Sequence, residues 1–275
     1  MTGVGISHGA LSVVNAIGCK KGAAFGISLE TRAEVEFSDS GFTLEINSRP
    51  APADFAKMLI QSVCPEVTGA KIKTVSNIPI AKGLKSGSAA ANAILLATCS
   101  EAGLEKTPEE ILFMNTRVSI AADISVTGAL DDAAACLLGG LVFSDNAQNR
   151  ILERRAMPQE YAVVIHVPKE CVTTCAFPAE RFAEKAAVSE TLFAKARAGN
   201  IFSAMYQNGS LVAEALGLTP AAADFALQCG ATAAGFSGCG PATGILVEKD
   251  QVQEFLTKFG CKNCITAEIW NGDAV

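Results

Sequence analysis

The segment IPIAKGLKSGSAAANA, at residues 78–93, constrains the fold of this chain more than any other stretch. Gly83 and Gly87 permit backbone angles that other residues avoid, so successive N–H groups of the loop can converge on one point. The alanines that follow have high helix propensity, and Gly103 is a suitable residue to end their helix. The sequence therefore predicts a glycine-serine loop that leads into a helix over residues 88–102.

Such a loop favours an anion, because the first N–H groups of a helix and the helix dipole attract negative charge. Ser86 and Ser88 add hydroxyls that can bond phosphate oxygens or reach Mg²⁺, and Lys82 and Lys85 add positive charge. The loop is not a Walker loop, since GxxxxGK[ST] occurs nowhere in the chain. The pattern indicates a phosphate site. The alternative from local sequence alone is a turn that only caps an alanine-rich helix.

Composition excludes several partners. The formal charge is −6, which argues against nucleic acid or an anionic membrane as a default partner. The uncharged run 225–247 contains glycines and a proline, which would break a membrane-spanning helix. The uncharged run 2–19 is followed by the basic pair Lys20–Lys21, whereas a secretory signal has its basic residues before the apolar run. We therefore expect a cytosolic protein with a small-molecule partner, and no pattern indicates its oligomeric state.

The ten cysteines are expected to be reduced thiols, because the sequence shows no secretory signal. Cys261 and Cys264 form a CxxC, and Cys171 and Cys175 form a CxxxC. A zinc site built from these four residues is disfavoured, since no histidine or glycine-turn context supports it. Buried or inert thiols are the preferred interpretation.

Strand and helix signals alternate along the whole chain. In the first half, residues 33–37 and 42–46 alternate about Asp39-Ser40-Gly41, which predicts a hairpin, and residues 71–75 predict a strand that leads into the loop. Thr107-Pro108-Glu109-Glu110 is a helix start with a capping box, and a third helix is expected from Asp131 to Gly139.

In the second half, the expected elements are strands at residues 161–167, 243–247 and 265–270, and helices opening at Thr219-Pro220 and over 250–259. Mixed strands and helices predict an α+β fold rather than a doubly wound sheet. At about 150 residues per domain the length predicts two domains, and the charged cluster at residues 150–155 suggests a division into 1–152 and 153–275.

Two further segments support a phosphate site. TGALDDAAACLLGG, at residues 127–140, places Asp131 and Asp132 at a helix start, where aspartate is also common for capping alone. Successive helical residues point about 100° apart, so one of the pair is expected to face a given site. FSGCGPATG, at residues 236–244, is a second glycine-rich loop that could also be a simple tight turn. Together the three segments indicate a phosphoryl-transfer site.

These motifs resemble those of the GHMP small-molecule kinases. The family motif Pro-x-x-x-Gly-Leu-Gly-Ser-Ser-Ala is followed closely by residues 79–89, and its C-terminal glycine loop is matched by residues 237–241. The opening SHGALSVVNAIGCKKGAAFGI, the Gly-Leu-Lys-Ser-x-Ser-Ala-Ala-Ala-Asn form of the loop and the Thr-Gly-Ala-x-Asp-Asp run resemble one branch, the archaeal shikimate kinases.

The resemblance implies a two-domain fold, with an N-terminal α+β domain, a C-terminal ferredoxin-like domain and the active site between them. It implies ATP-dependent phosphorylation of shikimate to shikimate 3-phosphate, a step of aromatic amino acid biosynthesis, with Mg²⁺ as the metal. Other readings are another GHMP kinase of the homoserine or mevalonate type, a decarboxylase of the same fold, or a nucleotide-binding regulator without catalysis.

The resemblance also implies residue roles. Asp132, seven residues before Gly139, would be the general base or orient the hydroxyl, with Asp131 as the alternate. Lys20, Lys21 and Lys85 are candidates to neutralise phosphate. Ser7, His8, Asn15 and Lys20 could bind the substrate. The nucleotide would be bound by Pro79, Lys82, Gly83, Leu84, Lys85, Ser86, Gly87, Ser88, Ala89, Gly238 and Gly240.

The metal site is where this chain departs from the family pattern. Gly87 replaces the second serine of the motif, and Ala121 occupies the position where many relatives have a glutamate ligand. We therefore expect Ser86, Ser88 and Asp123 to be the protein ligands of Mg²⁺.

Overall fold

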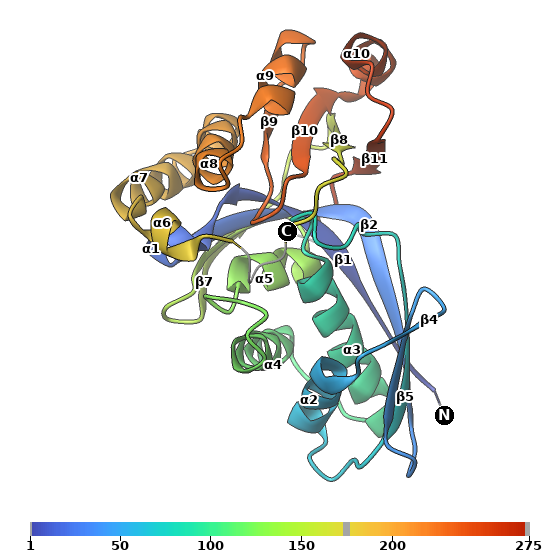
Figure 1. Ribbon diagram of the computed structural model, residues 1–275. Helices are drawn as coiled ribbons and strands as arrows, with labels where there is room; N and C mark the ends of the chain where they lie inside the picture. The colour runs from blue at the N-terminus through green and yellow to red at the C-terminus, as the bar shows by residue number, and fades with distance from the viewer. Residues whose placement is uncertain (1, 173–176, 273–275) are drawn as a thin grey trace.

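The computed structural model describes residues 2–172 and 177–272 (Figure 1). Two sheets organise them: a seven-stranded sheet of order β4-β3-β5-β2-β6-β7 with β1 paired to β2, and a four-stranded sheet of order β11-β8-β10-β9. The strands of the first are β1 (Gly3–Val14), β2 (Lys21–Phe37), β3 (Phe42–Ile46), β4 (Arg49–Ala51), β5 (Ala70–Ser76), β6 (Leu141–Asp145) and β7 (Arg150–Arg155). Those of the second are β8 (Tyr161–His166), β9 (Ala233–Phe236), β10 (Thr243–Glu248) and β11 (Cys264–Glu268). Helices and strands mixed in both halves confirm the α+β class.

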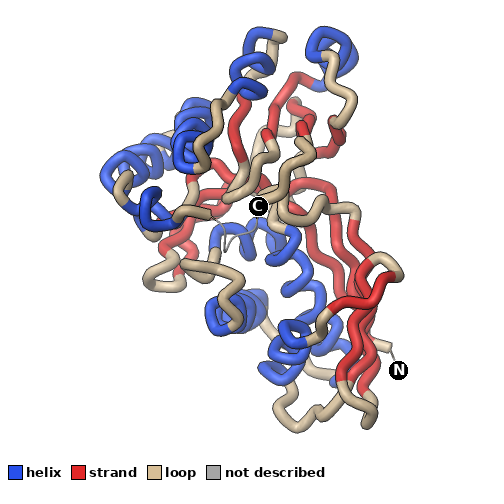
Figure 2. The backbone as a smooth tube through the Cα atoms, in the orientation of Figure 1, coloured by secondary structure: helices blue, strands red, loops and turns tan. Residues whose placement is uncertain are grey.

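Four helices lie on one side of the first sheet, as Figure 2 shows: α2 (Asp54–Val63), α3 (Ser86–Ala102), α4 (Pro108–Ala121) and α5 (Leu130–Leu138). Helices α3 and α5 pack on the strands, and α4 packs on the other three helices. Helix α3 lies directly on β1. A Cβ atom at Gly3 would lie 2.1 Å from the Ala97 carbonyl oxygen, and one at Gly5 would lie 2.2 Å from that of Ala93. The glycines of β1 thus let a buried alanine-rich helix approach the strand backbone, which fixes where the N-terminus of α3 lies.

The second half carries α6 (Ala179–Ala183), α7 (Ala186–Arg197), α8 (Ile201–Ala215), α9 (Ala221–Gln228) and α10 (Val252–Phe259), with a 3₁₀ turn at Lys249–Gln251. A short helix α1 (Ala16–Cys19) joins β1 to β2. The two halves share one hydrophobic core, which contains Leu11 and Phe25 from the first sheet and Val163 and Leu246 from the second. The end of the chain returns to β2, where the Trp270 N–H donates to the Gly26 carbonyl at 3.0 Å.

Most of the predicted elements are confirmed. Helix α3 begins at Ser86, two residues earlier than expected, after Lys85 in a left-handed conformation with φ of 64°. The capping box of α4 is present, with the Thr107 side chain and the Glu110 side chain each accepting from the other's backbone N–H. The change of sheet falls between β7 and β8, and the domain division at 152/153 stays a prediction.

The predicted hairpin of residues 33–37 and 42–46 is wrong. Strand β5 lies between β2 and β3, pairing antiparallel with β2 and parallel with β3. The alternating pattern identifies which side chains face the core, but it does not identify the partner strand. Gly41 does turn the chain, with φ of 82°, but the turn leads to the far side of β5.

Among the described residues, none of the helices is both long and apolar enough to cross a membrane.

Candidate active site

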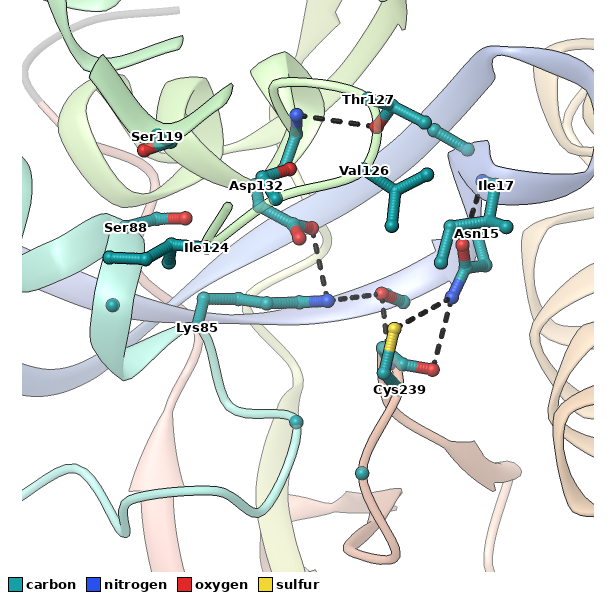
Figure 3. A pocket seen from close by; sticks show the side chains of 18 of the residues that line it. Asn15, Ile17, Lys85, Ser88, Ser119, Ile124, Val126, Thr127, Asp132 and Cys239 are labelled. Atoms are coloured by element: carbon teal, nitrogen blue, oxygen red, sulfur yellow. Dashed lines mark hydrogen bonds and ion pairs between the residues drawn. The ribbon is translucent and has the colours of Figure 1, made fainter. Parts of the chain in front are cut away.

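Three loops and the start of α1 enclose a cavity of about 260 Å³ (Figure 3). The loops are the glycine-serine segment before α3, the segment before α5 and the glycine-rich segment after β9. Its polar and glycine lining includes Ser12, Asn15, Gly83, Lys85, Ser86, Gly87, Ser88, Ser119, Ser125, Thr127, Gly128, Asp131, Asp132, Gly238, Cys239 and Gly240. Segments more than 200 residues apart in the sequence therefore meet at one site.

The N-terminus of α3 forms one wall of the cavity. A helix leaves its first N–H groups without partners inside the helix, and here these are the groups of Ser86, Gly87 and Ser88. Gly83 has φ of 86°, a conformation that turns the loop into this wall. The arrangement is suited to phosphate oxygens, as the sequence predicts.

The two glycine-rich loops are in close contact with each other. A Cβ atom at Gly83 would lie 1.9 Å from the Ser237 carbonyl oxygen, and one at Gly240 would lie 2.2 Å from the Lys82 carbonyl carbon. The Ser237 hydroxyl donates to the Gly83 carbonyl at 2.8 Å and accepts from the Ser12 N–H at 3.1 Å. The glycines are therefore required for this contact, which holds the second half of the chain against the phosphate loop.

Lys85 and Asp132 form an ion pair at the cavity, with 3.0 Å between Nζ and Oδ1. Lys85 extends across the cavity toward Asp132 (Figure 3) and also donates to the Ser12 hydroxyl at 2.7 Å. That hydroxyl accepts from the Gly238 N–H at 3.1 Å. Burial alone lowers the pKa of Lys85, but the charges of Asp132 and Asp131 hold it above its ordinary value, so the amine stays charged.

Asp131 has different surroundings from its neighbour. It is buried, its Oδ1 accepts from the Asn146 amide at 3.0 Å, and its carboxylate lies against Gly22, where a Cβ atom would come within 2.2 Å of Oδ2. Burial and the charge of Asp132 raise the pKa of Asp131 to about 7. Both aspartates line the cavity, and Asp132 is the one paired with a cation there.

The structure brings ten of the residues singled out from the sequence to the cavity: Asn15, Gly83, Lys85, Ser86, Gly87, Ser88, Asp131, Asp132, Gly238 and Gly240. Nine others lie outside its lining: Ser7, His8, Lys20, Lys21, Pro79, Lys82, Leu84, Ala89 and Asp123.

Lys82 was expected to bind the nucleotide, but its amine is directed elsewhere. It is buried and donates to the carbonyls of Pro168 at 2.6 Å, Lys169 at 3.0 Å and Glu170. These hydrogen bonds hold the phosphate loop, residues 79–89, against the segment that follows β8. Leu84 and Ala89 point into the core, at 1% and 0% exposure.

The opening segment contributes less than expected. The Ser7 hydroxyl donates to the Cys136 carbonyl in the core at 2.8 Å, and His8 stacks on Trp270 with 3.6 Å between ring centroids. Lys20 is exposed at the end of α1. Asn15 does reach the cavity, where its amide donates to the Gly238 carbonyl at 3.1 Å. Of these residues, only those whose side chains point into the cavity can contact a ligand there. The motif alone does not show in which direction a side chain points.

Ser119 of α4 lines the cavity and was missed from the sequence. Its hydroxyl donates to Asn115 at 3.0 Å, and Asn115 donates to Asn92 of α3 at 2.7 Å and to the Ser88 carbonyl at 3.2 Å. This buried chain of hydrogen bonds ties α4 to the phosphate-loop helix. Its only sequence signal is the position of Ser119 two residues before Ala121.

A magnesium ion prefers oxygen ligands and is usually held by one or two carboxylates together with phosphate oxygens. The hydroxyls of Ser86, Ser88 and Ser119 and the carboxylate of Asp132 supply such oxygens to the cavity, where Figure 3 shows Ser88 and Ser119 on one side and Asp132 beside Lys85. Within residues 2–172 and 177–272, acidic, histidine and cysteine side chains form no group of three that could hold a metal by themselves. The oxygen atoms in this cavity therefore fit a magnesium ion that binds together with a phosphate group, which supplies its remaining ligands.

Residues 53–140 match the family model of the GHMP kinases N terminal domain. The chain is 36% identical over 254 residues to a shikimate kinase of Methanocella arvoryzae, covering 90% of this chain and 85% of that protein. It is also 36% identical over 258 residues to a shikimate kinase of Methanothermobacter thermautotrophicus, covering 91% and 89%. Among solved structures, the mevalonate kinase of Methanococcus jannaschii has a TM-score of 0.76 at 15% identity, covering 97% and 98% of the two chains. The putative homoserine kinase of Listeria monocytogenes has a TM-score of 0.71 at 17% identity, covering 99% and 97%. At these identities the structural matches establish the fold alone.

Proposed function

Because the chain belongs to the GHMP kinase family, in its archaeal shikimate kinase branch, we propose that it transfers the γ-phosphoryl group of ATP to shikimate. The products are shikimate 3-phosphate and ADP. One observation carries the proposal: a charged Lys85–Asp132 pair lies in the same cavity as the N-terminus of α3, in a chain 36% identical to shikimate kinases over most of its length.

The phosphates of ATP bind at the N-terminus of α3. The N–H groups of Ser86, Gly87 and Ser88 donate to the phosphate oxygens, and the helix dipole favours their charge. Gly238 and Gly240 close the opposite wall with backbone alone, which leaves room for the transferred group.

The hydroxyls of Ser86, Ser88 and Ser119 are the protein groups that would hold Mg²⁺ together with the phosphate oxygens. When bound, the ion neutralises the phosphate charge that develops during transfer. Asp123, expected from the sequence as a ligand, is not among the residues that line the cavity, so we assign the role to Ser119.

The reaction needs a hydroxyl held in line with the γ-phosphorus and a place for its proton. Asp132 orients the attacking hydroxyl of shikimate and accepts its proton. Lys85 carries its charge next to this carboxylate and stabilises the negative charge spread over the phosphoryl oxygens. Ser12 fixes the Lys85 amine from the other side.

Release of ADP, measured with ATP and Mg²⁺ in one coupled assay, tests the proposal on shikimate, homoserine and mevalonate. We expect turnover on shikimate and none on the other two. Turnover on another alcohol would refute the substrate and retain the kinase. Release of CO₂ along with ADP would indicate a decarboxylase, and ATP binding without turnover on any alcohol would indicate a regulator.

A further inference from the structure

A second hollow, of about 390 Å³, lies on the outer face of the four-stranded sheet. It is lined by His166 of β8, by Phe225 of α9, by Phe259 at the end of α10, by Cys261 to Asn263, and by Ala221 and Ala222. Among the described residues it shares no lining residue with the active-site cavity. The hollow is therefore a separate feature, built by the second half of the chain alone.

Two cysteines lie at the two ends of one turn beside this hollow. Helix α10 ends at Phe259 with Gly260 as its cap, Lys262 and Asn263 form the turn, and β11 begins at Cys264. Residues i and i+3 of a turn have Cα atoms less than about 7 Å apart, and a disulfide requires about 4.4–6.8 Å. Cys261 and Cys264 are both half-buried free thiols. Their spacing thus allows a disulfide without rearrangement of the sheet.

The two thiols already interact with each other. Burial, and after it the neighbouring Cys261 thiol, raise the pKa of the Cys264 thiol, so Cys264 keeps its proton. Cys261 is the sulfur of the pair that lines the hollow, so a small disulfide entering the hollow meets Cys261 first.

Metal binding does not account for the pair. The part of the chain that the structure describes has no cluster of three histidine, cysteine or acidic side chains able to hold an ion. Of the other motif considered for zinc, Cys171 lines neither cavity and Cys175 lies outside the described residues.

His166 completes the site. It lies directly opposite Cys264 in the antiparallel pair of β8 and β11, a position that brings two side chains onto the same face of the sheet. Its Nδ1 atom is buried with no hydrogen-bond partner, and its ring packs edge-on against Phe259 at 6.2 Å. Burial lowers the pKa of His166, which keeps its ring neutral beside the two cysteines.

We propose that Cys261 and Cys264 form a reversible disulfide site that exchanges with a low-molecular-mass disulfide entering the hollow. The Cys261 thiolate attacks one sulfur of that disulfide, forms a mixed disulfide and releases one small thiolate. Cys264 then attacks the Cys261 sulfur and releases the second small thiolate, and the Cys264 proton passes to a released small thiolate. The protein loses two hydrogens and two electrons, and the small disulfide gains them as two thiols.

Oxidised glutathione serves as the probe. The full chain is equilibrated with mixtures of oxidised and reduced glutathione, free thiols are blocked by alkylation, and the denatured protein is digested with trypsin. Cleavage after Lys258 and Lys262 separates the two cysteines onto the peptides 259–262 and 263–275. We expect these peptides to remain joined after oxidising mixtures and to separate after treatment with dithiothreitol. Separate alkylated peptides at every ratio, or a bond from either cysteine to Cys229, would overturn the proposal.

Single substitutions test the order of attack. In Cys264→Ser, we expect glutathione to accumulate as a mixed disulfide on Cys261, because no second thiol displaces it. In Cys261→Ser, we expect Cys264 to remain unmodified under the same conditions. The exposed Cys171 is the matched control, since Cys171→Ser should leave the joined peptides unchanged. Modification of Cys264 in the absence of Cys261 would contradict the assignment of the attacking thiol. Circular dichroism and thermal midpoints confirm that each variant is folded.

Discussion

At the scale of single residues, neighbouring positions in the sequence acquire different chemistry from their surroundings. Asp131 and Asp132 both line the cavity, but Asp132 pairs with Lys85 while Asp131 contacts Asn146 and Gly22. The turn of the helix separates the two side chains, as the 100° spacing predicts. We therefore assign proton transfer to Asp132, whereas Asp131 is a buried neighbour with a raised pKa.

The first prediction concerns Lys85. Lys85→Met removes the positive charge beside Asp132 and leaves that carboxylate without its ion pair. We expect kcat for shikimate to fall by about 10²–10³, the usual cost of removing one group that stabilises transition-state charge. Lys21→Met is the matched control, because Lys21 makes an exposed ion pair with Glu190 outside the cavity. Equal losses in the two variants, measured by ADP release, would remove Lys85 from the mechanism.

The second prediction concerns the pH dependence of stability. The pKa of Asp131 is raised from 3.8 to about 7 by burial and by Asp132, so folding favours the protonated carboxyl. This contribution is fully present below pH 4 and is lost as the pH rises through 7. Asp131→Asn is neutral at every pH and keeps an oxygen for Asn146. At pH 8 we expect it to be more stable than wild type by ~2 kcal/mol.

Urea unfolding at pH 4 and pH 8 measures this difference. The advantage of Asp131→Asn over wild type should be present at pH 8 and absent at pH 4. A variant that is equally destabilised at both values would show that Asp131 is charged and well compensated in the folded state.

At the scale of elements, the site depends on two loops that touch through glycine. Gly83→Ala introduces a Cβ atom 1.9 Å from the Ser237 carbonyl oxygen, in a residue with φ of 86°. Gly41→Ala is the matched control, since Gly41 has φ of 82° and no atom within 4 Å of its Cβ position. We expect Gly41→Ala to cost about 1–2 kcal/mol from backbone strain alone, and Gly83→Ala to cost more and to weaken ATP binding.

Chemical unfolding and ATP titration of the two variants distinguish strain from contact. If both lose the same stability and both keep wild-type affinity for ATP, the contact between the loops does not support the nucleotide site.

Many elements were predictable from the sequence because their signals are local. Caps and breakers located α3, α4 and α5, alternation located β3 and the end of β2, and an apolar run located β8. The partner strand of β3 was not predictable from the sequence. Alternation shows which side chains of β3 face the core, and this is the same whichever strand lies beside it. The same limit applies within the site, where the loop position of Lys82 was correct but the direction of its amine, toward three carbonyls, depends on a segment 86 residues away.

At the scale of the whole molecule, one core joins the two sheets, and the end of the chain returns to β2. We therefore expect a single cooperative thermal transition in calorimetry rather than one for each half. A non-hydrolysable ATP analogue with Mg²⁺ should raise the midpoint of this transition, because it binds only the folded chain. At a concentration of 100 Kd it should increase the free energy of unfolding by about 2.7 kcal/mol. Two transitions, one of them insensitive to the analogue, would show that the halves fold independently.

We propose that the phosphoryl group is transferred to shikimate in the cavity of Lys85 and Asp132. The most direct test of this proposal is ADP release by wild type and Asp132→Asn with ATP, Mg²⁺ and shikimate, alongside the affinity of each for a non-hydrolysable ATP analogue. We predict that Asp132→Asn loses about 10²–10⁴ in kcat, the contribution of a positioned base, while it still binds the analogue. An Asp132→Asn variant that turns over shikimate at the wild-type rate would contradict the account.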